Sequence, residues 1–175
     1  LSLDEVEKIV CSNQDSIVIV DEAYIDFGGV SALSLVPRYE NLLVVQTFSK
    51  SRSMAGIRIG FAIGNPRLIR ALNDVNSYTM NMPSLILGKE AVKDDVYFKK
   101  TLKKIIETRE WSKKQLERLG FTFPDSMSNF IFASHKTAKA EEIFEALREN
   151  QIFVRYFKQP KLENYLRISI GTREE

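Results

Sequence analysis

The sequence predicts an α/β fold: a mostly parallel sheet followed by a small α+β domain. Three apolar, β-branched runs, at residues 16–21, 42–48 and 58–64, have the composition of strands that are buried on both faces of a parallel sheet. After about residue 100 the pattern changes to short strand-like segments around one helix, which is typical of an α+β domain. We therefore expect two domains, at residues 1–100 and 101–175.

Composition and charge narrow the classes of partner. The chain has 175 residues, of which 44% are hydrophobic and 27% charged, as in an ordinary globular protein. Its 25 basic and 23 acidic residues give a net charge of +2, which is too balanced to favour a nucleic-acid or membrane partner. The apolar runs are also far shorter than a membrane span.

The cysteine content and the first residue carry two further expectations. Cys11 is the one cysteine, so an intrachain disulfide and a cysteine metal cluster are excluded, and we expect no metal site. No signal peptide opens the sequence, which favours a cytoplasmic setting. The first residue is Leu1 rather than Met, and we expect the chain to be a piece of a larger protein.

Local signals place the elements of the first domain. Ser2 and Glu5 have the spacing of a capping box, which predicts a helix that extends to about Val10. A second helix is predicted at residues 66–76, with Pro66 in its first turn. Residues 84–119 form the longest helical pattern of the sequence.

The second domain is predicted to begin after Gly120, a residue type that often ends a helix. Alternating and β-branched patterns predict strands at residues 129–133, 152–157 and 166–170, and a helix at residues 139–149. His135, the one histidine, lies between Ser134 and Lys136 in what we expect to be an exposed turn without a nucleophile motif, so we assign it no catalytic role.

Acidic residues end the first predicted strand. Asp21 and Glu22 follow a buried run, as in the Walker B element of an ATPase, but that function needs a GxxxxGK[ST] loop that this sequence lacks. A purely structural alternative is that Asp21 caps the following turn. Taken alone, the structural alternative would be preferred.

A lysine follows the second predicted strand, and hydroxyl residues and an arginine lie near it in the sequence. Lys50 comes after the hydroxyl residues Thr47 and Ser49, and Arg58 follows eight positions later. Hydroxyls and a guanidinium can hold a phosphate, while a lysine amine can attack an aldehyde. A lone lysine after a strand is ordinarily a surface residue, so the combination carries the argument.

These residues together resemble a known family signature. The pattern Asp21-x-x-Tyr24, then Thr47-x-Ser49-Lys50 and Arg58, is similar to that of fold-type I enzymes of the class I/II aminotransferases, which depend on pyridoxal 5′-phosphate (PLP). The similarity runs end to end. Residues 154–155 and 166–175 most resemble the histidinol-phosphate aminotransferase subfamily.

The resemblance implies a cofactor and a role for each residue of the signature. Lys50 would hold PLP covalently and then act as the general base. Asp21 would contact the pyridine nitrogen, and Tyr24 the phenolic oxygen of the cofactor. The cofactor phosphate would be bound by Thr47, Ser49 and Arg58. Residues 1–100 would be the C-terminal portion of the PLP-binding large domain, and residues 101–175 the small C-terminal domain.

The resemblance also implies substrates and partners. Arg155 and Arg167 would bind the acidic group of the substrate, and two guanidiniums suit the phosphate of an amino donor. The expected reaction moves an amino group between L-histidinol phosphate and 2-oxoglutarate in histidine biosynthesis, in a homodimer. For Arg155, a surface strand residue is the alternative.

Other functions stay open at this point. An aromatic aminotransferase or a threonine-phosphate decarboxylase could share every cofactor residue. A non-catalytic fragment or scaffold is a third possibility, although such a protein would be expected to lack Lys50 or Asp21. Members of the family are about twice this length, so we expect the chain by itself to be inactive and prone to associate through apolar strand edges.

Overall fold

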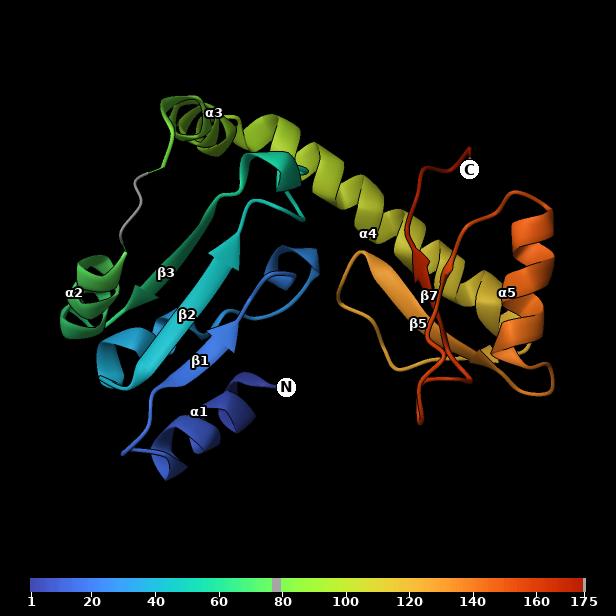
Figure 1. The fold of residues 1–175 in the computed structure, drawn as a ribbon, viewed down its shortest axis with the longest axis horizontal. Helices are drawn as coiled ribbons and strands as arrows, with labels where there is room; N and C mark the ends of the chain where they lie inside the picture. The colour runs from blue at the N-terminus through green and yellow to red at the C-terminus, as the bar shows by residue number, and fades with distance from the viewer. Residues whose placement is uncertain (77–79, 175) are drawn as a thin grey trace. The chain divides into compact units, whose positions relative to one another are not determined.

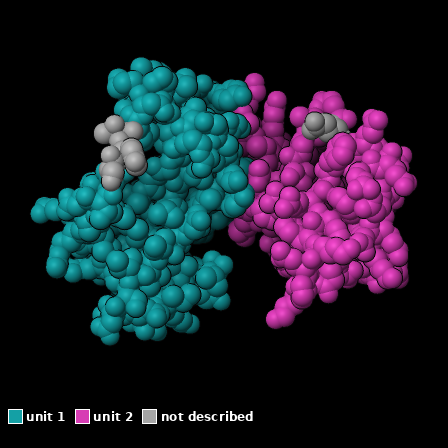
Figure 2. All heavy atoms as spheres, in the orientation of Figure 1, with its two compact units in different colours: residues 1–99 teal, residues 100–175 magenta. Residues whose placement is uncertain are grey.

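A computed structural model describes residues 1–76 and 80–174 of the chain. The chain divides into two compact units, Leu1–Lys99 (unit 1) and Lys100–Glu175 (unit 2), which are coloured separately in Figure 2. Within the described ranges, no helix is both long enough and apolar enough to cross a membrane.

Unit 1 is built on a three-stranded sheet with the order β1-β2-β3 (Figure 1). β1 (Val18–Asp21) pairs in parallel with β2 (Leu42–Thr47), and β2 pairs antiparallel with β3 (Gly60–Gly64). All three predicted strands are present. The fully described segment that joins β2 to β3 contains the 3-10 helix η3 (Ala55–Ile57) but no α-helix of the kind that usually carries the chain back for a parallel pair.

One prediction about these strands is wrong, because neither β3, whose residues are all exposed or half-buried, nor β1 is buried on both faces. Its side chains alternate between half-buried and exposed, and Ile19 is 62% exposed. The reason is that α1 (Leu3–Ser12) and the 3-10 helix η2 (Ala32–Arg38) contribute the core residues that pack with β1 on one face. Ile17 and Ile63 are also exposed.

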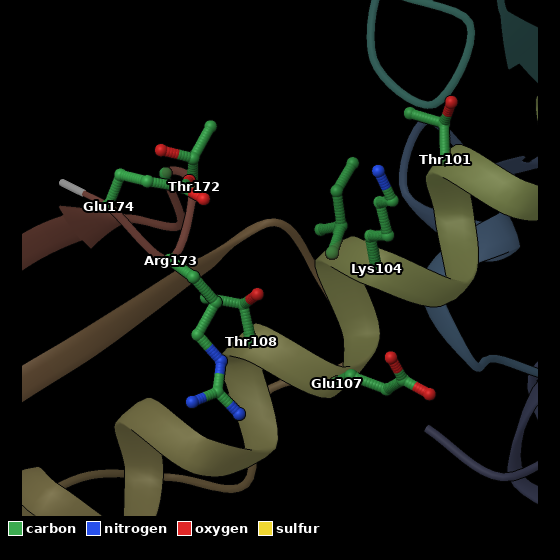
Figure 3. Close-up of a pocket in the computed structure, with 9 residues that line it drawn as sticks. Thr101, Lys104, Glu107, Thr108, Thr172, Arg173 and Glu174 are labelled. Atoms are coloured by element: carbon green, nitrogen blue, oxygen red, sulfur yellow. The ribbon is translucent and has the colours of Figure 1, made fainter.

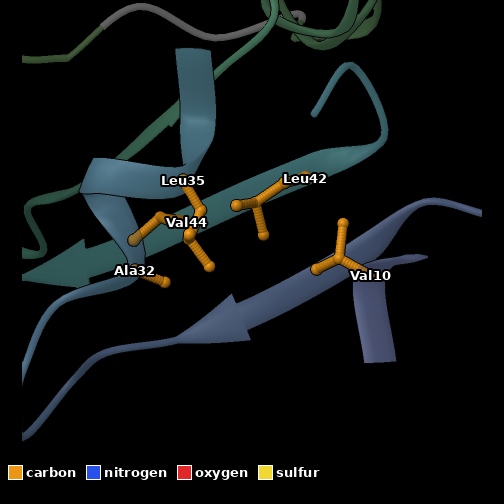
Figure 4. Close-up of a cluster of buried hydrophobic side chains, with 5 residues drawn as sticks. All are labelled: Val10, Ala32, Leu35, Leu42 and Val44. Atoms are coloured by element: carbon orange, nitrogen blue, oxygen red, sulfur yellow. The ribbon is translucent and has the colours of Figure 1, made fainter. Parts of the chain in front are cut away.

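The core of unit 1 joins α1 (Leu3–Ser12), η2 and β2 (Figure 4). Its buried members are Val10, Ala32, Leu35, Leu42 and Val44. The predicted capping box of α1 is confirmed, because the N–H of Glu5 donates to Ser2 Oγ and the N–H of Ser2 donates to Glu5 Oε2.

The predicted long helical region is two helices. α3 (Met82–Lys93) ends and α4 (Asp95–Arg118) begins at Asp94, whose carboxylate accepts a hydrogen bond of 3.2 Å from the N–H of Tyr97. An aspartate that satisfies an N–H in the first turn of a helix favours a new start. The helix predicted at Pro66 is confirmed as α2 (Pro66–Val75), with Asn65 as its N-cap.

Unit 2 contains a four-stranded sheet with the order β4-β5-β7-β6. The strands are β4 (Phe121–Thr122), β5 (Phe130–His135), β6 (Arg155–Tyr156) and β7 (Leu166–Ser169), joined by antiparallel pairing. The predicted helix is present as α5 (Ala140–Glu149). Gly120, with a φ of 90°, follows the end of α4 as predicted.

Two details of unit 2 differ from the expectation. β6 is much shorter than the predicted strand, because the N–H of Ile152 donates to Leu147 O and ties the start of that segment to the end of α5. His135 is a structural residue rather than an exposed one: its Nε2 lies 2.9 Å from Leu119 O, and its Nδ1 accepts from the N–H of Ala138.

Candidate active site

The cofactor candidates in unit 1 meet at one edge of the sheet. Asp21 ends β1 and Thr47 ends β2, and since these strands are parallel their carboxyl ends share that edge. β3 runs in the opposite direction, so Arg58, two residues before its start, reaches the same edge. The N–H of Phe48 extends this pairing by donating to Ile59 O at 3.1 Å.

Lys50 and Tyr24 lie close together at this edge. Nζ of Lys50 is 5.4 Å from the centre of the Tyr24 ring, a cation–π distance. Tyr24 begins the short 3-10 helix η1 (Ile25–Phe27), which is anchored by the fully buried Phe27. Lys50 itself is exposed. The structure therefore brings a primary amine and a phenol together from segments 26 positions apart.

Two hydroxyl residues, Thr47 and Ser49, precede Lys50 and hydrogen-bond to each other. The N–H of Ser49 donates to Thr47 Oγ1 at 3.1 Å, and the two hydroxyl oxygens are 2.9 Å apart. Arg58 adopts the left-handed conformation, with a φ of 56°, at the end of the 3-10 helix η3 (Ala55–Ile57). Its guanidinium donates to Ala55 O at 3.0 Å and is exposed.

The two neighbouring acidic residues have different environments. Oδ1 of Asp21 accepts from the N–H of Ala23 at 3.0 Å, so the predicted turn cap is present, and the side chain is exposed. Glu22 is 5% exposed and accepts hydrogen bonds from Ser31, Ala32 and Gln46 at 2.6–2.8 Å. Asp21 is therefore exposed at the end of β1 with one oxygen engaged in the turn, while Glu22 fastens η2 to the sheet.

Two residues that the sequence did not single out are close in the chain to Lys50 and Tyr24. The hydroxyl of Ser51, which follows Lys50, donates to the carboxylate of Asp26, which lies in η1. Their separation of 25 positions leaves no local pattern to detect.

The donor set fits PLP. A lysine amine matches the aldehyde, a carboxylate matches the pyridine nitrogen, and a phenol can donate to the phenolic oxygen. Two hydroxyls and a guanidinium are suitable donors to a phosphate.

The substrate candidates of unit 2 form a cross-strand pair. Arg155 in β6 and Arg167 in β7 are directly opposite each other in the antiparallel register. Like charges at such positions repel unless an anion lies between or over them. Nε of Arg167 is buried and has no hydrogen-bond partner among the described residues, and its guanidinium lies 5.2 Å from the centre of the Phe130 ring. Arg155 is exposed.

Unit 2 also has a hollow of about 370 Å³ between α4 and the segment that follows β7 (Figure 3). Its walls include Lys104, Glu107 and Thr108 of α4, and Thr172 and Arg173 of the C-terminal segment. Opposite charges on its walls give it no clear preference for an anion or a cation, and none of the sequence-predicted site residues lines it.

Comparisons with known proteins agree with this chemistry. The family model for aminotransferase class I and II matches residues 1–175. A histidinol-phosphate aminotransferase of Brachyspira hyodysenteriae is 56% identical over all of this chain and 51% of its own length. The chain thus spans about half the length of the curated relatives that it matches.

Solved structures agree in fold. The histidinol-phosphate aminotransferase of Clostridium acetobutylicum matches 98% of this chain and 55% of its own, with a TM-score of 0.87 and 21% identity. The enzyme of Sinorhizobium meliloti, solved in complex with pyridoxal 5′-phosphate, matches 95% of this chain and 48% of its own, with a TM-score of 0.81 and 23% identity. The α/β class expected from the sequence is confirmed, and the chain belongs to the class I and II aminotransferase family.

Proposed function

We propose that the complete protein containing this chain is a PLP-dependent aminotransferase that moves an amino group between L-histidinol phosphate and 2-oxoglutarate. The observation that carries the proposal is the position of the Lys50 amine beside Tyr24, at the sheet edge shared by Asp21 and Thr47. In this proposal unit 1 is the C-terminal portion of the PLP-binding large domain, and unit 2 is the small C-terminal domain.

Each residue at the edge then has a defined task. When bound, PLP supplies an aldehyde and an electron-withdrawing ring. Lys50 holds the cofactor covalently and, once displaced, carries a proton between the substrate Cα and C4′ of the cofactor. Asp21 keeps the pyridine nitrogen protonated, and Tyr24 donates to the phenolic oxygen.

The phosphate of the cofactor is bound by three residues that surround the lysine loop, Thr47, Ser49 and Arg58. Arg58 has a left-handed backbone conformation, and its guanidinium is held by a hydrogen bond to Ala55 O. Charge-assisted hydrogen bonds of this kind are roughly twice as strong as neutral ones.

The arginine pair of unit 2 supports a phosphate-bearing amino donor. Arg155 and Arg167 are opposite each other on neighbouring strands, and a dianion would relieve their mutual repulsion. The unpartnered, buried Nε of Arg167 has a donor to offer such an anion. The acceptor 2-oxoglutarate carries carboxylates that the same guanidiniums can bind.

The apolar exposure of unit 1 supports association. Ile19 of β1 and Ile17 just before that strand are exposed, as are Ile63 on the opposite face of the sheet and Ile86 and Leu87 of α3. Monomeric proteins rarely leave large apolar surfaces uncovered, so we propose that further protein covers this one, within a homodimer of the complete protein.

The test is chemical trapping followed by turnover. The complete protein is incubated with PLP, reduced with borohydride and mapped by peptide mass spectrometry, and we expect the cofactor fixed to Lys50. The unreduced protein should then form glutamate from L-histidinol phosphate and 2-oxoglutarate. A protein without any fixed cofactor would overturn the enzyme proposal in favour of a scaffold.

Substrate panels separate the remaining alternatives. Faster turnover of an aromatic amino acid would identify an aromatic aminotransferase. Release of carbon dioxide from threonine phosphate would identify a decarboxylase. Either result would retain the cofactor site and replace the amino donor.

A further inference from the structure

The loops that carry Tyr24 and Lys50 leave the sheet together. The N–H of Glu22 donates to Val45 O at 2.8 Å, next to the last residue pair of the β1–β2 ladder. Beyond this bond the two segments are no longer paired as strands, although both side chains must be held close for the lysine to stay beside the phenol. Some further contact has to set the spacing of the two loops.

The hydrogen bond from Ser51 to Asp26 is placed to do this. Ser51 directly follows Lys50, is 3% exposed, and donates its hydroxyl proton to Oδ2 of Asp26. Asp26 lies two residues after Tyr24, in η1, next to the fully buried Phe27. The acceptor end of the contact therefore lies beside a fully buried aromatic side chain, and the donor end lies directly after the lysine.

The backbone at Lys50 is held on both sides. Before it, the N–H of Ser49 donates to Thr47 Oγ1. After it, the chain bends sharply, because the N–H of Ser53 donates to Lys50 O at 3.0 Å and Ser53 has a φ of 56°. Without the Ser51 hydrogen bond, this bend would be tied to the neighbouring loop less firmly.

We propose that Asp26 and Ser51 are a pair of positioning residues that set the Lys50 amine against Tyr24. The inference rests on the proposed function and deepens it. Neither residue is assigned to touch the cofactor or the substrate. Their effect is exerted through the geometry of Lys50, where a displacement of about 1 Å can lower a rate by about 100-fold.

The experiment uses the complete protein, four single variants and the double variant that combines Ser51→Ala with Asp26→Ala. Ser51→Ala removes the donor and Asp26→Ala removes the acceptor, while Asp26→Asn keeps an oxygen of the same shape that can still accept. Ser34→Ala, at an exposed position of η2, is the matched serine control.

Two readouts distinguish positioning from simple destabilisation. The first is the pH titration of the absorbance of the lysine-bound cofactor, together with kcat and KM for the amino donor. The second, in protein without cofactor, is amide hydrogen exchange over residues 22–27 and 48–54, which reports the freedom of the two loops.

We expect Ser51→Ala and Asp26→Ala to lower kcat by about 10- to 100-fold, with KM changed less than about threefold. They should shift the absorbance titration and speed exchange in both loops. The double variant should be no worse than either single variant, because the residues act as one unit. Asp26→Asn and Ser34→Ala should stay within about threefold of the parent in kcat.

Unchanged titration and kcat in both alanine variants, or additive losses in the double variant, would overturn the positioning role alone. If Ser51→Ala fails to fold, the exposed Asp26 still decides the matter through its alanine and asparagine variants. A parent protein without cofactor on Lys50 would overturn the proposed function and the positioning role together.

Discussion

The two units use their polar and apolar surfaces differently. Unit 1 carries its candidate site on exposed loops at a sheet edge, and most of the large apolar side chains that are exposed in the described residues belong to it. Unit 2 places a half-buried arginine, with a buried Nε, in the middle of its sheet and leaves fewer large apolar side chains exposed. We infer that unit 1 carries out the chemistry and contacts further protein, and that unit 2 binds an anion.

Removal of the Lys50 amine is the strongest test of the difference between the two units. Lys50→Ala in the complete protein should lower kcat by at least about 100- to 10,000-fold, because both the covalent hold and the proton carrier are lost. Steady-state kinetics with saturating PLP measures this, and Lys8→Ala on the exposed face of α1 is the control. A loss of less than about tenfold would remove the chemistry from unit 1.

The arginine pair should affect binding more than chemistry. Arg167→Ala should raise KM for the phosphate-bearing donor by about 10- to 100-fold, since a hydrogen bond to a charged group is worth about 1.5–3 kcal/mol. The exposed Arg155 should matter less, with a rise of about tenfold or below. If Arg167→Ala instead lowered kcat and left KM unchanged, unit 2 would take part in the chemistry.

The exposed sheet face of unit 1 can be tested on the 175-residue chain. A charge at Ile19, as in Ile19→Lys, should weaken self-association by about tenfold, because burying one isoleucine contributes about 1.5–3 kcal/mol. Light scattering over a concentration series measures it. Ile152→Lys, an exposed position of unit 2, should have no comparable effect. Equal effects of the two substitutions would abolish the difference between the units.

The smallest expected effect concerns the acid stability of unit 2. Lys113 Nζ lies 2.9 Å from Glu110 Oε1 and 2.6 Å from Asp125 Oδ1. Burial raises the pKa of Glu110, but hydrogen bonds from Lys113 and Arg109 outweigh it, so the pKa is lowered below its ordinary 4.5. The hydrogen bond from Lys113 lowers the pKa of Asp125 below its ordinary 3.8.

Carboxyl groups with a lowered pKa stabilise the fold above their unfolded pKa and lose that contribution as the pH falls through the folded value. The free energy of unfolding should therefore fall below about pH 4, by less than about 1 kcal/mol because both carboxylates are largely solvated. Denaturant unfolding of the parent and of Lys113→Met at pH 7 and 3 measures this. The difference between the two proteins should shrink at pH 3, and a constant difference would contradict it.

The sequence revealed the features that depend on neighbouring residues. The capping box of Ser2 and Glu5, the stop at Gly120 and the strands that carry Asp21 and Thr47 all follow from local patterns, and all are present. The break at Asp94 was hidden because apolar periodicity continues through it, although its side chain satisfies the next helix.

Contacts between segments that are far apart in the chain could not be predicted from the sequence. The contact between Ser51 and Asp26, the opposition of Arg155 to Arg167, and the exposed face at Ile19 each depend on strand register and on what packs against the sheet. A β-branched run has the same composition whether one face or both are covered. The outcome depends on neighbours that the run itself does not encode.

The adjacent carboxylates at the end of β1 make the register of that strand critical. Asp21 is exposed at the end of β1 and Glu22 fastens η2, because successive side chains of an extended chain point in opposite directions. Losing one residue from the strand would place Glu22 where Asp21 lies and Ala23 where Glu22 lies, so the three donors that now bond Glu22 would lose their acceptor. Substitutions along β1 can therefore accumulate during evolution, whereas insertions or deletions of a single residue would be eliminated.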